Sequence, residues 1–221
     1  MSSKFDYLLK FILIGDSSVG KTNILSVYKD GTFNPKLQPS IGVEFIAKNI
    51  EIEDLIFRLQ IWDTAGQENF ISMTKVYYKN SSCAFLVYDI TEKDTFNNIE
   101  FWLNELNKEA PESILCVLIG NKSDMNDKRE VTYEEGRNYA KKHKMLFYET
   151  SAKSKANIDL IFKESVQYIN DNIQKGVYNL DDDSCGVKLR NSKKVINIEE
   201  FDLDMSTLGA DRQLKKKKCC G

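Results

Sequence analysis

The chain reads Gly15-Asp16-Ser17-Ser18-Val19-Gly20-Lys21-Thr22 near its N-terminus. This stretch fits the pattern G-x-x-x-x-G-K-[ST] and lies between an apolar run at 8–14 and a helix-like segment at 21–29. A strand, a glycine-rich turn and a helix form the context in which this pattern binds phosphate. The glycines let backbone N–H groups converge on an anion, and the helix adds the positive end of its dipole. The sequence therefore predicts a loop that binds the phosphate chain of a nucleotide.

Two side chains of this loop have expected roles of their own. Lys21 is long enough to reach the outer phosphates, and the Thr22 hydroxyl is expected to be a ligand of the accompanying Mg²⁺ ion. The residues expected to bind the phosphates are Gly15, Asp16, Ser17, Ser18, Val19, Gly20, Lys21, Thr22 and Asn23. The pattern by itself does not distinguish one nucleotide from another.

Length and composition describe one sizeable domain followed by a tail. Of the 221 residues, 42% are hydrophobic and 29% charged, which is typical of a globular protein. The net charge of −2 gives no sign of general nucleic-acid binding. His143 is the only histidine, so the chain lacks a Ser/His or Cys/His catalytic pair. Cys83 and Cys116 fall in apolar runs and are expected to be reduced core residues, which favours a cytoplasmic protein.

Strand-like and helix-like segments alternate along the first three quarters of the chain. The expected strands are 8–14, 43–50, 55–62, 83–89, 114–120 and 145–149. The expected helices are 21–29, 69–79, 94–108, 132–143 and 156–174. This alternation predicts an α/β fold of the P-loop NTPase type, a six-stranded, mostly parallel sheet with about five helices on both faces. The short connection at 51–54 predicts a hairpin, which makes one edge strand antiparallel.

The periodic pattern ends near residue 175. Beyond it, blocks of like charge alternate with scattered apolar residues. Such a composition favours disorder, because it offers little apolar surface to bury. Residues 1–175 are therefore predicted to form the domain, and 176–221 a disordered tail.

A second motif, Asp63-Thr64-Ala65-Gly66-Gln67, follows the expected strand 55–62. An acidic side chain at a strand end beside a phosphate loop is expected to hold Mg²⁺, usually through a water molecule, and this role falls to Asp63. Gly66 permits a close approach of the backbone to the terminal phosphate. Gln67 is the expected catalytic residue, because its amide can orient an attacking water molecule.

A third motif, Asn121-Lys122-Ser123-Asp124, follows the expected strand 114–120 and predicts the base. The Asp124 carboxylate can accept hydrogen bonds from the N1–H and the 2-amino group of guanine, whereas adenine would leave it unpaired. The base pocket is expected to include Asn121, Lys122, Asp124, Ser151, Ala152 and Lys153.

Together the segments GDSSVGKT, DTAGQ, NKSD and ETSAK resemble a Ras-superfamily small GTPase over residues 8 to about 174. The segments IGVEF at 41–45, RLQIW at 58–62 and LVYDIT at 86–91 resemble the Rab family within it. This resemblance implies that Phe33 packs on the guanine and that Phe45, Trp62 and Tyr77 form an apolar effector patch. The competing interpretation is that these three are ordinary half-buried strand aromatics.

The resemblance also implies partners and a function. The partners are an exchange factor, a GTPase-activating protein, effectors, a prenylation escort and a GDP-dissociation inhibitor. The function is a GTP/GDP switch in vesicle and membrane traffic. Without an evident arginine finger in the chain, hydrolysis is expected to be slow, roughly 10⁻⁴–10⁻³ s⁻¹, and an activator's arginine adds up to about 10⁵-fold.

Three positions depart from the family pattern. Ser40 stands where the family nearly always has threonine, whose hydroxyl ligates Mg²⁺ and whose N–H meets the γ-phosphate. Serine keeps both groups but loses the methyl that restricts χ1, so a working but looser switch is expected. Leu37 replaces a common tyrosine and Asn69 a common arginine. These changes keep open an alternative function, a scaffold that binds GTP or GDP with little hydrolysis.

The chain ends in four lysines, Lys215–Lys218, followed by Cys219, Cys220 and a glycine. A C-a-a-X box would need cysteine at position 218, where the chain has lysine. The ending instead resembles the double-cysteine signal of Rab proteins, which implies geranylgeranyl groups on Cys219 and Cys220. The protein is then expected to cycle between the cytoplasm and the cytosolic face of intracellular membranes. The alternative is an unmodified basic tail.

Overall fold

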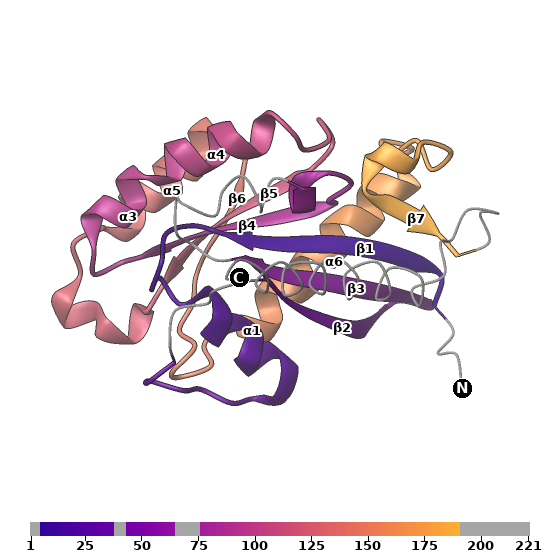
Figure 1. The fold of residues 1–221 in the computed structure, drawn as a ribbon. Helices are drawn as coiled ribbons and strands as arrows, with labels where there is room; N and C mark the ends of the chain where they lie inside the picture. Colours follow the sequence, from indigo (N-terminus) through magenta and orange to yellow (C-terminus); the bar gives the residue numbers. More distant parts are fainter. Residues whose placement is uncertain (1–4, 38–42, 65–75, 191–221) are drawn as a thin grey trace, which may run out of the picture.

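The computed structural model describes residues 5–37, 43–64 and 76–190 (Figure 1). The strands are β1 (Tyr7–Ile14), β2 (Val43–Ile52), β3 (Leu55–Thr64), β4 (Cys83–Asp89), β5 (Leu115–Asn121), β6 (Leu146–Glu149) and β7 (Val187–Leu189). The helices are α1 (Lys21–Asp30), α3 (Lys93–Asn97), α4 (Ile99–Asn107), α5 (Tyr133–Lys142) and α6 (Ile158–Gln174). Within the described residues, short 3₁₀ helices cover Ser123–Lys128 and Asp183–Cys185.

The sheet confirms the predicted α/β class. Its order is β2-β3-β1-β4-β5-β6, with β2 and β3 antiparallel and the other neighbouring pairs parallel. The hairpin expected around 51–54 joins β2 to β3. In parallel strands the carboxyl ends share one edge of the sheet, so the loops after β1, β3, β5 and β6 meet there.

Both faces of the sheet are covered, and β1 divides its side chains between them (Figure 1). Leu9, Phe11 and Leu13 pack with buried residues of α1 and α6. Ile12 and Ile14 pack on the other face, with buried residues of α4 and α5. A strand buried on both faces is continuously apolar, which explains why this segment shows no polar alternation.

The helix expected at 94–108 is interrupted at Asn98, which separates α3 from α4. There the Asn98 side chain reaches out of the helix pair and donates a hydrogen bond to Asp16, at 2.7 Å. The helix expected at 69–79 falls largely outside the described residues.

The predicted disorder of the tail is wrong for residues 176–190. Here β7 pairs antiparallel with β1, with Val187 opposite Leu9, and adds a seventh strand to the six that were expected. Because β4 pairs only with residues 11–14 of β1, the first half of that strand has an open edge, and β7 occupies it. The side chains of Tyr178, Cys185 and Val187 are buried in the core. The predicted tail beyond residue 190 lies outside the described residues.

Among the helices that the structure describes, none combines the length and the apolar character needed to cross a membrane.

Candidate functional site

The phosphate loop joins β1 to α1, and its backbone explains its two glycines. Gly15 has φ 141° and Gly20 has φ 99°, conformations that L-residues rarely adopt. A Cβ at Gly15 would lie 2.2 Å from the carbonyl oxygen of Val87, and one at Gly20 would lie 2.4 Å from Nδ2 of Asn121. Close packing on the neighbouring strand ends therefore excludes a side chain at both positions.

The Lys21 ammonium is held inside this loop. The side chain is buried, and its Nζ donates hydrogen bonds to the carbonyl oxygens of Gly15, at 2.8 Å, and Asp16, at 2.7 Å. Burial lowers the pKa of Lys21 to about 8, while the charges of Asp63 and Asp16 raise it. A phosphate group beside the ammonium would favour its charged form, so the loop is prepared for an anion.

Thr22 and Asp63 supply oxygens that suit a magnesium ion. The Thr22 hydroxyl donates to Oδ2 of Asp63 over 2.5 Å, while Oδ1 of Asp63 has no hydrogen-bond partner in the described part of the chain. Asp63 is fully buried, and burial raises its pKa to about 6. A buried carboxylate oxygen without a partner is costly, and Mg²⁺ prefers oxygen ligands. These two residues therefore fit the ion.

Asn121 links the phosphate loop to the loops at the other end of the site. Its Nδ2 donates to the carbonyl oxygen of Val19 over 2.8 Å, and its Oδ1 accepts from the Thr150 hydroxyl over 3.1 Å. The side chain is buried, with 1% of its surface exposed. Asn121 therefore acts as a brace between residues far apart in the sequence.

Asp124 lies at the end of the site where the sequence predicts that the base binds. It accepts a hydrogen bond from the Ser151 hydroxyl at 2.5 Å and lies 3.7 Å from the Lys153 ammonium. The backbone of Lys122 is in the left-handed region, with φ 67°. Its Nζ forms an ion pair with Oδ2 of Asp89 at 2.5 Å. The contacts with Ser151 and Lys153 hold the Asp124 carboxylate at the edge of a cavity.

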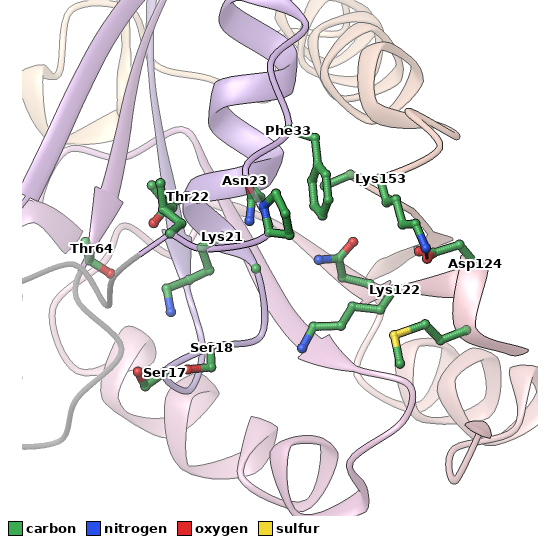
Figure 2. Close-up of a pocket in the computed structure, with 16 residues that line it drawn as sticks. Ser17, Ser18, Lys21, Thr22, Asn23, Phe33, Thr64, Lys122, Asp124 and Lys153 are labelled. Carbon is green, nitrogen blue, oxygen red and sulfur yellow. Dashed lines mark ion pairs between the residues drawn. The ribbon is translucent and has the colours of Figure 1, made fainter.

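The two ends enclose one cavity of about 410 Å³. Figure 2 shows Ser17, Ser18 and Lys21 on one side of it, and Asp124 and Lys153 on the other. Its lining residues are Ser17, Ser18, Gly20, Lys21, Thr22, Asn23, Phe33, Pro35, Leu37, Thr64, Asn121, Lys122, Asp124, Met125, Ala152 and Lys153. With Lys21 at one end and the Asp124 carboxylate at the other, the cavity has the layout that a nucleotide would need.

Some predicted site residues lie beside the cavity without lining it, and others fall outside the described residues. Gly15, Asp16, Val19, Asp63 and Ser151 do not line it. The Asp16 carboxylate points to α4, where it accepts from Trp102 Nε1 and Asn98 Nδ2. Ser40, Gly66 and Gln67 lie outside the described residues.

Asn23 lines the cavity and also shapes the segment that follows α1. Its amide exchanges two hydrogen bonds with the backbone of Asn34, at 3.0 and 3.1 Å. This pairing holds the segment that carries Phe33, which lines the same cavity.

Pro35, Thr64 and Met125 line the cavity although the sequence predicted no site role for them, and Leu37, noted above only as a departure from the family pattern, lines it too. Thr64 and Met125 directly follow Asp63 and Asp124, so their nearness to the motifs was the available signal. The Thr64 hydroxyl itself donates to the carbonyl oxygen of Leu13 over 2.8 Å. Pro35 and Leu37 belong to no motif, and they reach the cavity because the segment that follows α1 passes beside it.

The three aromatic residues predicted as an effector patch are contiguous. The ring centroid of Trp62 lies 4.6 Å from that of Phe45 and 5.0 Å from that of Tyr77. Phe45 is directly opposite Trp62 in the β2–β3 pairing and is 36% exposed. The Lys10 ammonium lies about 6 Å from the Trp62 and Tyr77 rings. The rings therefore form one cluster that reaches the surface.

Comparison with known protein families matches residues 10–171 to the model described as Ras family. The matched range covers the phosphate loop, Asp63, the Asn121–Asp124 segment and the loop after β6.

Proposed function

The chain belongs to the Ras family, and we propose that within this family it is a Rab-type GTPase that regulates vesicle and membrane traffic. Proteins of this family bind GTP or GDP with Mg²⁺ and hydrolyse GTP. They act as switches, because the γ-phosphate orders two segments that exchange factors, activating proteins and effectors recognise.

The aromatic cluster is the observation that carries the Rab-type proposal. The two segments proposed to respond to the γ-phosphate are 33–45 and 64–78; Phe45 is the last residue of the first, and Tyr77 lies near the end of the second. Trp62 contacts both rings. A partner that covers the cluster would therefore contact both segments at once, and a partly exposed aromatic surface is a suitable anchor for such a partner.

Residues in and beside the cavity, together with Gln67, would supply the chemistry of nucleotide binding and hydrolysis. Lys21 contributes a positive charge beside the outer phosphates, and Thr22 and Asp63 would hold Mg²⁺, which when bound neutralises phosphate charge. Gln67 is proposed to orient the attacking water. No arginine lines the cavity within the described residues, so slow turnover that depends on an activator is the proposed behaviour.

The membrane part of the proposal rests on the sequence of the tail. Two prenylated cysteines, Cys219 and Cys220, would give stable anchoring where a single lipid chain gives only marginal anchoring. The four preceding lysines would each add about 1 kcal/mol of attraction to an anionic leaflet. A prenylation escort and a GDP-dissociation inhibitor are the proposed partners that handle the lipidated form.

Single-turnover hydrolysis of bound GTP tests the enzymatic half of the proposal. We expect a rate of roughly 10⁻⁴–10⁻³ s⁻¹ for the protein alone, a lower rate for Gln67→Ala, and a large increase when a matching activating protein is present. A rate that no activator raises would instead favour the alternative, a hydrolysis-poor GTP/GDP-binding scaffold.

Localisation tests the membrane half. The full chain with an N-terminal tag should reach intracellular membranes, and the double variant Cys219→Ser/Cys220→Ser should remain in the cytoplasm. The matched control Cys185→Ser changes a cysteine that is buried in the core and should localise as the unaltered protein does. Membrane association that survives loss of both terminal cysteines would contradict the lipid anchor.

A further inference from the structure

The Asp16 carboxylate has a hydrogen-bond partner for each of its oxygens, and both partners lie more than eighty residues away. Trp102 Nε1 donates to Oδ1 and Asn98 Nδ2 donates to Oδ2, each over 2.7 Å. Trp102 is 2% exposed, and it follows Asn98 by four residues. Residues four apart lie on one face of a helix, so the two donors reach the same carboxylate together. Hydrogen bonds to an ionised acceptor are stronger than neutral ones.

The backbone of Asp16 is in turn part of the phosphate site. Its carbonyl oxygen accepts a hydrogen bond from the Lys21 ammonium over 2.7 Å. The next two residues, Ser17 and Ser18, line the cavity. A carboxylate that is anchored at both oxygens limits the movement of this peptide unit, and with it the position of the ammonium.

We propose that Trp102 and Asn98 are positioning residues for the phosphate loop: by clamping the Asp16 carboxylate, they hold the Lys21 ammonium in place and slow nucleotide release. Neither residue lines the cavity. Their effect therefore passes through Asp16. This role depends on the nucleotide binding common to the family and not on the membrane role proposed above.

Trp102 also has a packing role, which must be separated from its role as a donor. Its ring lies in the core cluster with Ile12, Ile99 and Leu103. The ring provides the packing and the indole N–H provides the hydrogen bond. Trp102→Phe keeps an aromatic ring but removes the N–H. Asn98→Ala removes the other donor at the interruption between α3 and α4, without removing a buried ring.

The test measures release of a fluorescent GDP analogue from the loaded, full-length protein after addition of excess GDP. Trp102→Phe and Asn98→Ala should each raise the release rate about tenfold, the size expected for part of a hydrogen bond to a charged group. The control Leu106→Val shortens a fully buried side chain on the same helix. It should change the release rate less than twofold, although it lowers the melting temperature.

A double-mutant cycle with Asp16→Ala shows whether the effect passes through the carboxylate. In the Asp16→Ala background, Trp102→Phe should produce no further increase. An undiminished increase in that background, or a release rate for Trp102→Phe equal to that of Leu106→Val, would overturn the proposal. If the unaltered protein failed to bind the analogue, the family-based assignment of nucleotide binding would fail instead.

A spectroscopic signal gives an independent readout. The chain has two tryptophans, Trp62 and Trp102, so the indole N–H resonances in a ¹⁵N correlation spectrum can be assigned by substitution. The Trp102 N–H resonance should move in Asp16→Asn, because a neutral amide replaces the ionised acceptor, whereas that of Trp62 should stay in place. An unmoved Trp102 resonance would show that the clamp is not formed in solution.

Discussion

The variant Asn121→Ala should lower both the stability of the fold and the affinity for nucleotide, because the Asn121 side chain joins two loops that lie far apart in the sequence. Its amide donates to the Val19 carbonyl and accepts from the Thr150 hydroxyl. Alanine removes both hydrogen bonds. The Val19 carbonyl and the Thr150 hydroxyl are then left without these partners in a buried region, since both residues are fully buried.

The expected magnitude follows from those two groups. A buried polar group that loses its partner costs about 1–3 kcal/mol. Water that enters the vacated space can satisfy part of the need, so we expect the free energy of unfolding to fall by about 2–4 kcal/mol for the two groups together. The phosphate loop loses its brace at Val19, so nucleotide affinity should fall as well, by about tenfold or more.

Denaturant unfolding of the nucleotide-free protein and titration with GDP measure the two effects. Asn121→Asp is the matched comparison, because it has nearly the same shape. One carboxylate oxygen can still accept from Thr150, but the other faces the Val19 carbonyl, so two acceptors oppose each other. We expect Asn121→Asp to lose at least as much affinity as Asn121→Ala. The reasoning is refuted if Asn121→Ala changes the free energy of unfolding by less than about 0.5 kcal/mol and leaves GDP affinity intact.

Three further predictions concern other parts of the molecule. Gly186→Ala should destabilise the pairing of β7 and lower the melting temperature, because Gly186 has φ 78° and a Cβ there would lie 2.5 Å from the carbonyl carbon of Ser81. Unchanged hydrogen exchange at 187–189 would contradict this. Glu135→Gln should make stability less sensitive to acid. The hydrogen bond from Lys93 and the capping of α5 lower the pKa of Glu135 to about 2, so the stability that its carboxylate contributes is present above about pH 4.5 and is lost as the pH falls towards 2. Thermal melts of both proteins across that pH range measure the difference. Asp124→Asn should weaken GDP binding about 10- to 100-fold, because a charged acceptor is lost, and calorimetry that gave equal affinities would argue against the carboxylate as the base reader.

Much of the fold could be predicted because its signals are local. The apolar strands, the amphipathic helices and the short hairpin connection each lie within a window of a few residues, and the sheet confirms the class that they indicate. The phosphate loop at Gly15–Thr22 could also be predicted, because its turn needs glycine at fixed positions. The structure places Asp63 near the end of β3, Asn121 at the end of β5 and Asp124 in the 3₁₀ helix that follows β5, as their positions after apolar runs indicated.

Two features, the strand β7 and the clamp on Asp16, could not be predicted from the sequence, because each depends on contacts between residues far apart in the chain. The segment that contains β7 is short and rich in charge, so its composition favours disorder. It is ordered because it completes the open edge of β1, and that edge exists only once β4 has paired with the later half of the strand.

The clamp on Asp16 is likewise a product of the assembled fold. Trp102 has the spacing of an ordinary core residue on an apolar helix face, and nothing near it in the sequence indicates a carboxylate partner. What the sequence alone determined was the set of local elements and the motifs that bind a nucleotide. The tertiary structure decided which distant groups support those motifs, because hydrogen bonds and buried contacts between remote residues form only when the whole sheet and its helices are in place.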